Sequence, residues 1–432
     1  MAHQRSPHLG QPLPAALRRR RLLPARKADV PDEHPAGRER IMDDVLSGNP
    51  AALSCPAAAY HQTRQQGVHF SEAMNAYVVS SHHDVLRVIL DARTFSSSNA
   101  LGAPAPGPDS EMSNYLPYLL TSTDPEHARR RSIVNRAFTP RRIAGHEAAV
   151  TGICHRLVNA LRHQDSVDFV NDVAIPLPIS AIMHVLGLPE EDRPDLLRWS
   201  QELVRATVGV REFDPEQIVP PGRPLAARIA QRLNSARNGV LPLIHESGIP
   251  PADAARFVID LLVAGNFTTT AYLTSAMHIL ARAPELADQL RAHPTDIAGF
   301  VEETLRLENP LQGMYRMTTR DCELGGVPLP EGTRILVLFG SANQDPAEWP
   351  DPDTFDPQRA DAANHLTFGR GTHTCLGSTL VRLQGRLLIH TFLANTAHFE
   401  PATPEITYLP NPIFRCPTAL HLKVTWKAPT DP

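Results

Sequence analysis

The sequence predicts a mainly α protein with a minor β-sheet, folded as a single large helical domain. Three observations lead to this prediction. Apolar residues recur with helical periodicity over most of the chain beyond residue 46, strand-like runs are few and short, and no internal repeat divides the chain. With 432 residues the chain is long enough to bury a large core without disulfides or a structural metal.

Amphipathic helices are predicted where apolar residues are spaced three or four positions apart. We expect them over Asp84–Leu90, Ala148–Leu161, Pro178–Leu186, Leu225–Ile244, Pro251–Arg282, Pro284–Ala292, Ile297–Leu307 and Val381–Ile389.

Strands and long loops are predicted at fewer places. Ala76–Val79 and Arg334–Leu338 are β-branched or apolar runs bounded by turns, and Val327–Gly332 is typical of a strand end with a turn. Asn99–Ser122 and Arg211–Pro224 are rich in glycine and proline. We expect both to be long loops, which in compact proteins are often functional.

Composition excludes several classes of protein. Lys plus Arg is 42 and Asp plus Glu is 46, a net charge of −4, so no nucleic-acid or anionic-membrane partner is expected. The five cysteines contain no C-x-x-C pair, which argues against a disulfide scaffold or a zinc finger. No apolar run approaches the roughly 20 residues that span a bilayer. We therefore expect a cytoplasmic protein without a membrane partner.

Residues 1–45 differ from the rest of the chain. They are rich in proline and contain the run Arg18–Arg21. Basic, proline-rich ends rarely fold, so we expect a disordered extension followed by a domain over residues 46–432. A targeting or docking arm is the alternative.

The segment with the clearest chemistry is FGRGTHTCLG, residues 368–377. Its glycines permit tight turns, and a helix is predicted shortly after it. Cys375 would therefore lie near a helix N-terminus, where N–H groups and the helix dipole favour a thiolate. A thiolate suits a soft or borderline metal, with haem iron as the candidate. A buried structural cysteine is the alternative.

This segment resembles the haem-binding loop of the cytochrome P450 family, F-G-x-G-x-H-x-C-x-G, at all six fixed positions. The resemblance implies the cytochrome P450 fold and haem b as cofactor, with Cys375 as the metal ligand. It also implies that Phe368 covers the thiolate and that His373 lies against a haem propionate. The loop glycines that it assigns to the cofactor site are Gly369, Gly371 and Gly377.

Further haem contacts follow from the same resemblance. Residues 124–131 resemble the family's D-P-x-x-H-x-x-x-R helix, with one residue fewer before the histidine. His127 and Arg131 are four residues apart and so share a helical face, from which they could bind a carboxylate. A solvated basic helix is the alternative. Arg316 is the third contact that the resemblance implies.

Glu303 and Arg306 form one of five E-x-x-R patterns in the chain. Such a pair is by default a surface contact of small energy. This one lies on a predicted helix ahead of the cysteine loop, and it resembles the family's buried Glu–Arg pair. The resemblance implies a structural role for both residues, with Arg359 as the third member.

The sequence AGNFTT at residues 264–269 aligns with the family pattern A-G-x-[DE]-T-T. The resemblance implies catalytic positions at Gly265, which would leave room for dioxygen, and at Thr268, with Thr269 as a possible helper. Phe267 stands at the acidic position, and phenylalanine cannot relay a proton. Asn266 could order water. Oxygen insertion and oxidative C–C or C–N coupling without oxygen insertion both stay open.

The family's fold would also place a mostly apolar set of side chains around the substrate, which suits a hydrophobic or aromatic small molecule. These candidates are Leu101, Met112, Leu119, Val204, Val263, Phe267, Gln312, Met314 and Phe414. No residues are left over for a fused reductase, so we expect electrons from a ferredoxin and ferredoxin reductase. Arg, Ala and Pro usage suggests bacterial natural-product biosynthesis. A haem protein without turnover, and a helical binding protein without haem, are the other hypotheses.

Overall fold

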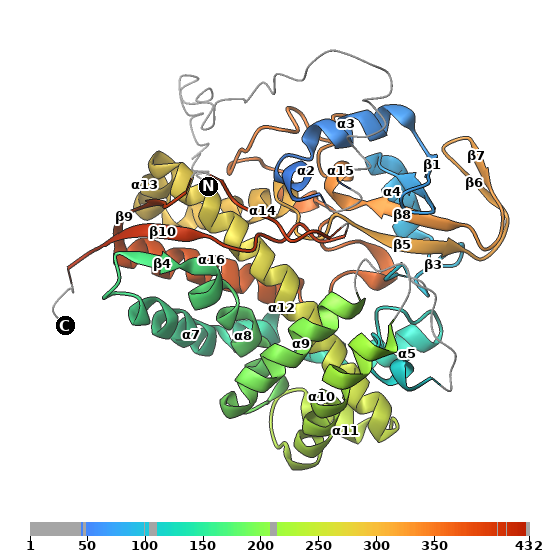
Figure 1. The fold of residues 1–432 in the computed structure, drawn as a ribbon, viewed down its shortest axis with the longest axis horizontal. Coiled ribbons are helices and arrows are strands. Elements are labelled where there is room, and N and C mark those ends of the chain that lie inside the picture. Colours follow the sequence, from blue (N-terminus) through green and yellow to red (C-terminus); the bar gives the residue numbers. More distant parts are fainter. Residues whose placement is uncertain are drawn as a thin grey trace, which may run out of the picture.

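Helices form most of the structure, and a mixed sheet lies at one end of them (Figure 1). This computed structural model describes residues 45, 49–98, 100–102, 110–207, 214–403, 405–411 and 413–428, with the backbone alone at 50, 51, 204 and 207. The predicted fold class, mainly α with a minor sheet, is confirmed. Apart from Val45, the predicted extension lies outside the described residues, so the domain boundary stays a prediction.

The helices follow one another along most of the chain. Their bounds are α2 (Pro50–Ser54), α3 (Ala57–Gln66), α4 (His82–Leu90), α5 (Glu126–Asn135), α6 (Pro140–Ala144), α7 (Glu147–Ala160), α8 (Pro176–Leu186), α9 (Arg193–Thr207), α10 (Pro215–Ser235), α11 (Leu241–Glu246), α12 (Pro251–Arg282), α13 (Pro284–Ala292), α14 (Ile297–Leu307), α15 (Phe339–Ala342) and α16 (Ser378–Asn395). Short helical turns that matter below are η2 (Glu111–Asn114) and η8 (Gly371–His373).

The strands form three sheets. The five-stranded sheet has the order β1 (His69–Ser71), β2 (Ala76–Val79), β8 (Arg334–Leu338), β5 (Gly313–Thr318), β3 (Phe95–Ser96). The smaller sheets join β4 (Ser166–Asp168), β10 (His421–Trp426) and β9 (Thr396–Pro401), and β6 (Cys322–Leu324) with β7 (Val327–Leu329). In the large sheet only β2 and β8 run parallel among these described strands.

Strand β8 is buried on both faces of the large sheet. Leu336 and Leu338 belong to one apolar cluster, while Ile335 and Val337 belong to another, as the alternation of side chains along a strand requires. Its neighbour β5 pairs Arg316 with Ile335 and so fixes Arg316 in the interior.

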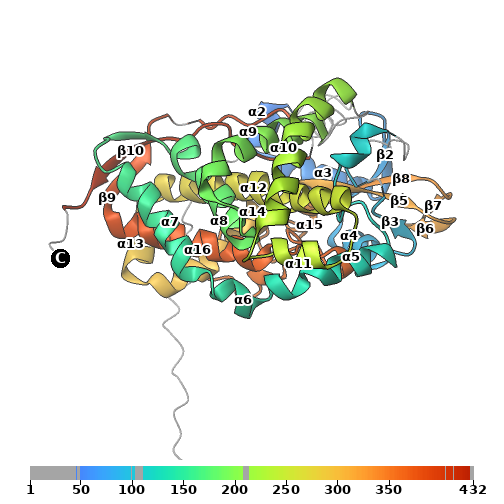
Figure 2. The ribbon, with the colours of Figure 1, turned by 90° about the horizontal axis from the view of Figure 1, so that it is seen from below.

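The longest helix, α12, runs through the middle of the molecule (Figures 1 and 2). It packs against α8, α9 and α10 on some sides and against α14 and α16 on others. By length and composition alone it could cross a membrane, but 67% of its most apolar stretch is buried inside the fold. Burial on all sides explains its apolar sequence, as in the core helix of a large domain.

The chain differs from the sequence prediction between residues 225 and 244. A single helix was predicted there, but α10 ends at Ser235 and α11 begins at Leu241. The N–H group of Val240 donates to the carbonyl of Leu186, 3.0 Å away, at the end of α8. Gly239 has φ +74°, and a Cβ there would lie 2.5 Å from that same carbonyl. Contact with α8 therefore breaks the helix.

The prediction of a loop over Arg211–Pro224 is also wrong in the described residues, from 214 onward, because α10 already begins at Pro215. The Asp214 side chain caps the helix by accepting from the N–H of Glu216. Three prolines lie inside the helix, but Ile218, Leu225 and Ile229 are buried. Packing against α9 and α12 thus overrides the poor helix propensity of proline. The other predicted loop, Asn99–Ser122, contains the short helical turn η2 in the part that the structure describes.

Candidate functional site

The cysteine loop, residues 366–377, connects the sheet side of the molecule to α16. Gly369 and Gly371 have φ values of +62° and +74°, which glycine adopts without strain. The N–H of Cys375 donates to the carbonyl of Phe368 at 2.8 Å, so the loop folds back on itself. Helix α16 begins at Ser378, three residues earlier than predicted.

The Cys375 thiol is accessible and yet enclosed by protein. Its side chain is exposed, but desolvation by the surrounding protein raises its pKa. Hydrogen bonds from the Gly377 and Ser378 backbone and the charges of Arg131 and Arg382 act in the opposite direction. The N–H groups at the start of α16 therefore favour the thiolate, as the sequence predicts, but burial outweighs them in the free thiol. A coordinated metal would deprotonate the thiol.

A second accessible position lies at the centre of α12. Ala264 is exposed, although Leu262 and Asn266 beside it are buried. The Thr268 hydroxyl donates to the Ala264 carbonyl at 3.1 Å, and residues four apart share a helical face. Solvent therefore reaches this face of α12. The cysteine loop leads directly into α16, and α16 packs against α12.

Gly265, next to Ala264, faces a neighbouring helix. A Cβ at this residue would meet the Ile182 side chain of α8 at 3.5 Å, so this position faces α8. The small residue on the accessible face is Ala264, which sequence reasoning missed. Thr269 is 1% exposed and its hydroxyl donates to the Gly265 carbonyl. Of the three predicted catalytic residues, Thr268 is the one whose hydroxyl shares the face of Ala264.

Phe267 has an apolar partner. Its ring lies 4.8 Å from that of Phe414, at 48°, and both belong to one apolar cluster with Leu101 and Tyr315. Asn266 is 4% exposed, and its side-chain oxygen has no hydrogen-bond partner among the described residues. The neighbourhood of Phe267 thus holds rings in place of a proton-relaying carboxylate.

Two histidines from distant segments meet next to the cysteine loop. The rings of His127 on α5 and His373 on η8 stack at 3.9 Å with an angle of 30°. Arg131, one turn after His127, donates to the carbonyls of Thr372 and Thr374 at 3.1 and 2.5 Å. The structure therefore brings together the predicted residues of α5 and of the loop.

Arg316 adds a buried positive charge to this group. It is 6% exposed, its guanidinium donates to the Tyr315 carbonyl, and burial lowers its pKa to about 10. No described carboxylate lies within ion-pair distance of it. Burial and the charges of His127, Arg316 and Arg131 lower the pKa of His373 to about 3. A buried cationic cluster of this kind fits a dianion such as the two carboxylates of a haem.

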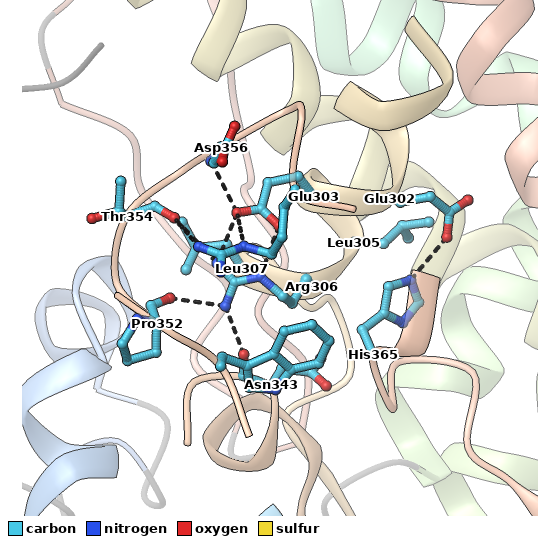
Figure 3. A network of polar contacts seen from close by, with 12 residues as sticks. Glu302, Glu303, Leu305, Arg306, Leu307, Asn343, Pro352, Thr354, Asp356 and His365 are labelled. Atoms are coloured by element: carbon cyan, nitrogen blue, oxygen red, sulfur yellow. Dashed lines mark hydrogen bonds and ion pairs between the residues drawn. The ribbon is translucent and has the colours of Figure 1, made fainter. Parts of the chain in front are cut away.

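Glu303 and Arg306 form a fully buried ion pair (Figure 3). The guanidinium donates to both carboxylate oxygens at 2.8 Å and also to the carbonyls of Asn343 and Pro352. Arg359 approaches Glu303 at 3.3 Å. The three charged residues thus join α14 to the segment that precedes the cysteine loop, as a structural role requires.

The predicted pocket residues fall into three groups. Leu101, Phe267 and Phe414 share one apolar cluster, and Val263 packs against both this cluster and the main helical core. The main core includes Leu119, and Met112 packs against it from η2. Elsewhere, Met314 packs against a third cluster. Gln312 is 2% exposed, and its side-chain oxygen has no hydrogen-bond partner among the described residues. The side chain of Val204 lies outside the described residues.

Comparisons with known proteins agree with this geometry. The model of the family described as Cytochrome P450 matches residues 297–418. Cytochrome p450 CYP199A2 from Rhodopseudomonas palustris is 31% identical over 393 residues, which cover 87% of this chain and 92% of the relative. The chain belongs to the cytochrome P450 family.

Solved structures resemble this cytochrome P450 over most of its length. CYP109Q5 from Chondromyces apiculatus aligns with a TM-score of 0.79 and 28% identity, covering 88% of this chain and 99% of the other. HmtN, a post-tailoring hydroxylase involved in himastatin biosynthesis, aligns with a TM-score of 0.74 and 28% identity, covering 86% and 97%.

Membership of the family makes this cytochrome P450 a haem-thiolate oxidoreductase of the monooxygenase class, with haem b as cofactor. The chain fits that cofactor at two places, because it has an accessible enclosed thiol at Cys375 and a buried cationic cluster around Arg316. When bound, the haem iron supplies the reductive activation of dioxygen.

Proposed function

We propose that Cys375 is the axial ligand of the haem iron and that His127, Arg131, Arg316 and His373 bind its propionates. The buried Arg316 guanidinium carries this proposal, because a buried cation that has no counter-ion among the described residues requires an anion. Phe368 and the three loop glycines shape the loop around the sulfur.

On the opposite side, Thr268 is the proposed catalytic hydroxyl. Its Oγ1 proton is donated to the Ala264 carbonyl at 3.1 Å, and rotation about χ1 would redirect it toward the accessible face. Phe267 cannot take part in a relay, so water held by Thr268 would have to deliver protons on this side.

The proposed substrate is a hydrophobic or aromatic small molecule of bacterial natural-product biosynthesis. The rings of Phe267 and Phe414 contact each other at a tilt and, together with Leu101 and Val263, offer apolar surface next to the accessible face of α12. HmtN, to which this chain is similar in structure, is a hydroxylase involved in himastatin biosynthesis.

Oxygen insertion is the first candidate outcome. Oxidative C–C or C–N coupling is the second, and it is suggested by Phe267, which stands where the family pattern has an acid. We further propose that a ferredoxin and its reductase supply the electrons and that the protein works in the cytoplasm.

The test compares metabolites of the source organism with and without this gene by mass spectrometry. A missing product that is one oxygen atom heavier than its accumulated precursor would support insertion. A product lighter by two hydrogens, or one that joins two precursors, would support coupling. Carbon monoxide treatment of the reduced protein tests the ligand separately: absence of a red-shifted Soret band would contradict ligation by Cys375.

A further inference from the structure

The ion pair between Glu302 and Arg382 contacts the cysteine loop at Phe368 and is not one of the proposed haem contacts. Arg382 on α16, seven residues after Cys375, donates to both carboxylate oxygens of Glu302 at 2.6 and 2.8 Å. Its guanidinium carbon also lies 4.5 Å from the centroid of the Phe368 ring. The pair therefore contacts the residue whose carbonyl accepts the Cys375 N–H.

His365 holds the other side of Glu302 (Figure 3). Its Nε2 lies 3.4 Å from the second carboxylate oxygen. The N–H of Thr367 donates to Nδ1 at 3.2 Å, so Nδ1 is the acceptor and the proton resides on Nε2. Burial lowers the pKa of His365, which keeps the ring neutral. Its ring lies 5.5 Å from that of Phe368.

The negative charge of Glu302 and the positive charge of Arg382 cancel. Burial alone would raise the pKa of Glu302, but the contact with His365 and the hydrogen bonds and charge of Arg382 hold it at about 2, so the carboxylate is ionised. Arg382 is positive, and its charge acts on Cys375 in the direction that favours the thiolate. The side chains of Glu302 and Arg382 are 17% and 34% exposed, so solvent reduces this interaction without removing it.

We propose that the Glu302–Arg382 pair sets the reduction potential of a haem ligated by Cys375, with Arg382 raising it, Glu302 lowering it and His365 positioning Glu302. The inference rests on the proposed ligation. Reduction adds negative charge to the iron–thiolate unit, so a nearby cation stabilises the reduced state and a nearby anion destabilises it. None of the three residues is proposed to bind the iron, so each would act on the haem only through its charge or through another residue.

The experiment measures the equilibrium reduction potential of the haem-loaded protein in redox titrations of four variants. Glu302→Gln leaves Arg382 uncompensated, so the potential should become more positive. Arg382→Gln leaves Glu302 uncompensated, so it should become more negative. The double variant should return close to the wild-type value. Arg382→Lys keeps the positive charge but has a single donor group, so its reduction potential should stay near that of the wild type.

A matched control lies on the same helix. Arg386 pairs with Glu147 at 3.3 Å, farther along α16 and with both side chains about half exposed. Arg386→Gln removes the same charge and should leave the potential near that of the wild type.

A purely structural pair would shift the potential in the same direction in both single neutral variants, because each breaks the same contact. Same-sign shifts, unchanged potentials or an Arg382→Lys variant that behaves like Arg382→Gln would each overturn the inference. The ferrous carbon monoxide spectrum is recorded for every protein. A wild type without the red-shifted band contradicts the proposed ligation, whereas unmoved potentials with the band intact contradict this inference alone.

Discussion

The ring of Phe267 lies 4.8 Å from the ring of Phe414 and occupies the position at which the family pattern has an acid. The two rings join the middle of α12 to the turn near residue 413, and they make this part of the site apolar. If Thr268 is the catalytic hydroxyl, as proposed, protons would reach it through water, because neither ring can relay them.

Thr268→Ala should uncouple reduction from product formation, because it removes the hydroxyl that shares the accessible face with Ala264. We expect the ratio of hydrogen peroxide to NADPH consumed to rise several-fold while the carbon monoxide spectrum is unchanged. Thr268→Ser, which keeps a hydroxyl, is the matched control. An unchanged peroxide ratio in Thr268→Ala would show that this hydroxyl is not needed.

Cys375→Ser should abolish the red-shifted carbon monoxide band, because a hydroxyl does not supply a thiolate ligand. Cys322→Ser is the control, since Cys322 lies on β6, outside the cysteine loop, and this variant should keep the band. A red-shifted band that survives in Cys375→Ser would point to another cysteine as the ligand.

Glu303→Gln should destabilise the protein by about 3–5 kcal/mol, the range for breaking a buried ion pair and leaving one charge uncompensated. Glu126→Gln tests a matched E-x-x-R pair at the surface, where Glu126 contacts Arg129 at 2.6 Å, and it should have little effect. Urea unfolding of both variants measures the difference. Equal effects would mean that burial of Arg306 does not matter.

His278 should make the fold less stable as the pH falls. Burial lowers its pKa to about 4 from the ordinary value of 6.5, and its Nδ1 has no described hydrogen-bond partner. Between these values the unfolded chain binds a proton that the folded chain does not, so stability is lost on going from pH 6.5 toward 4. At pH 5 this amounts to about 2 kcal/mol, an upper figure because the side chain is partly exposed.

Urea unfolding at pH 7.5 and pH 5 measures this contribution as the difference between the wild type and His278→Asn. The variant should lose less stability on acidification. His163→Asn, at an exposed position, should behave like the wild type. If His278→Asn loses as much stability as the wild type, this histidine is not the source of the pH dependence.

The sequence predicts the helices whose apolar period is unbroken. Pro251–Arg282, Pro284–Ala292 and Ile297–Leu307 have the predicted bounds. It also determined the family, because the cysteine motif is local and every fixed position lies within ten residues. Local patterns of this kind depend on backbone geometry and side-chain period, which neighbours along the chain fix.

Only the tertiary structure decided what depends on residues far apart in the chain. Contact with α8 ends α10 at Ser235, and packing against α9 and α12 keeps the proline-rich start of α10 helical. The direction of Gly265 toward Ile182, and not toward the accessible face, follows from the packing of α8. Arg382 meets Glu302 across 80 residues, a pair whose only sequence signal was an arginine two turns after Cys375. Burial and long-range charge interactions arise only when distant segments pack together, so they cannot be predicted from local sequence patterns.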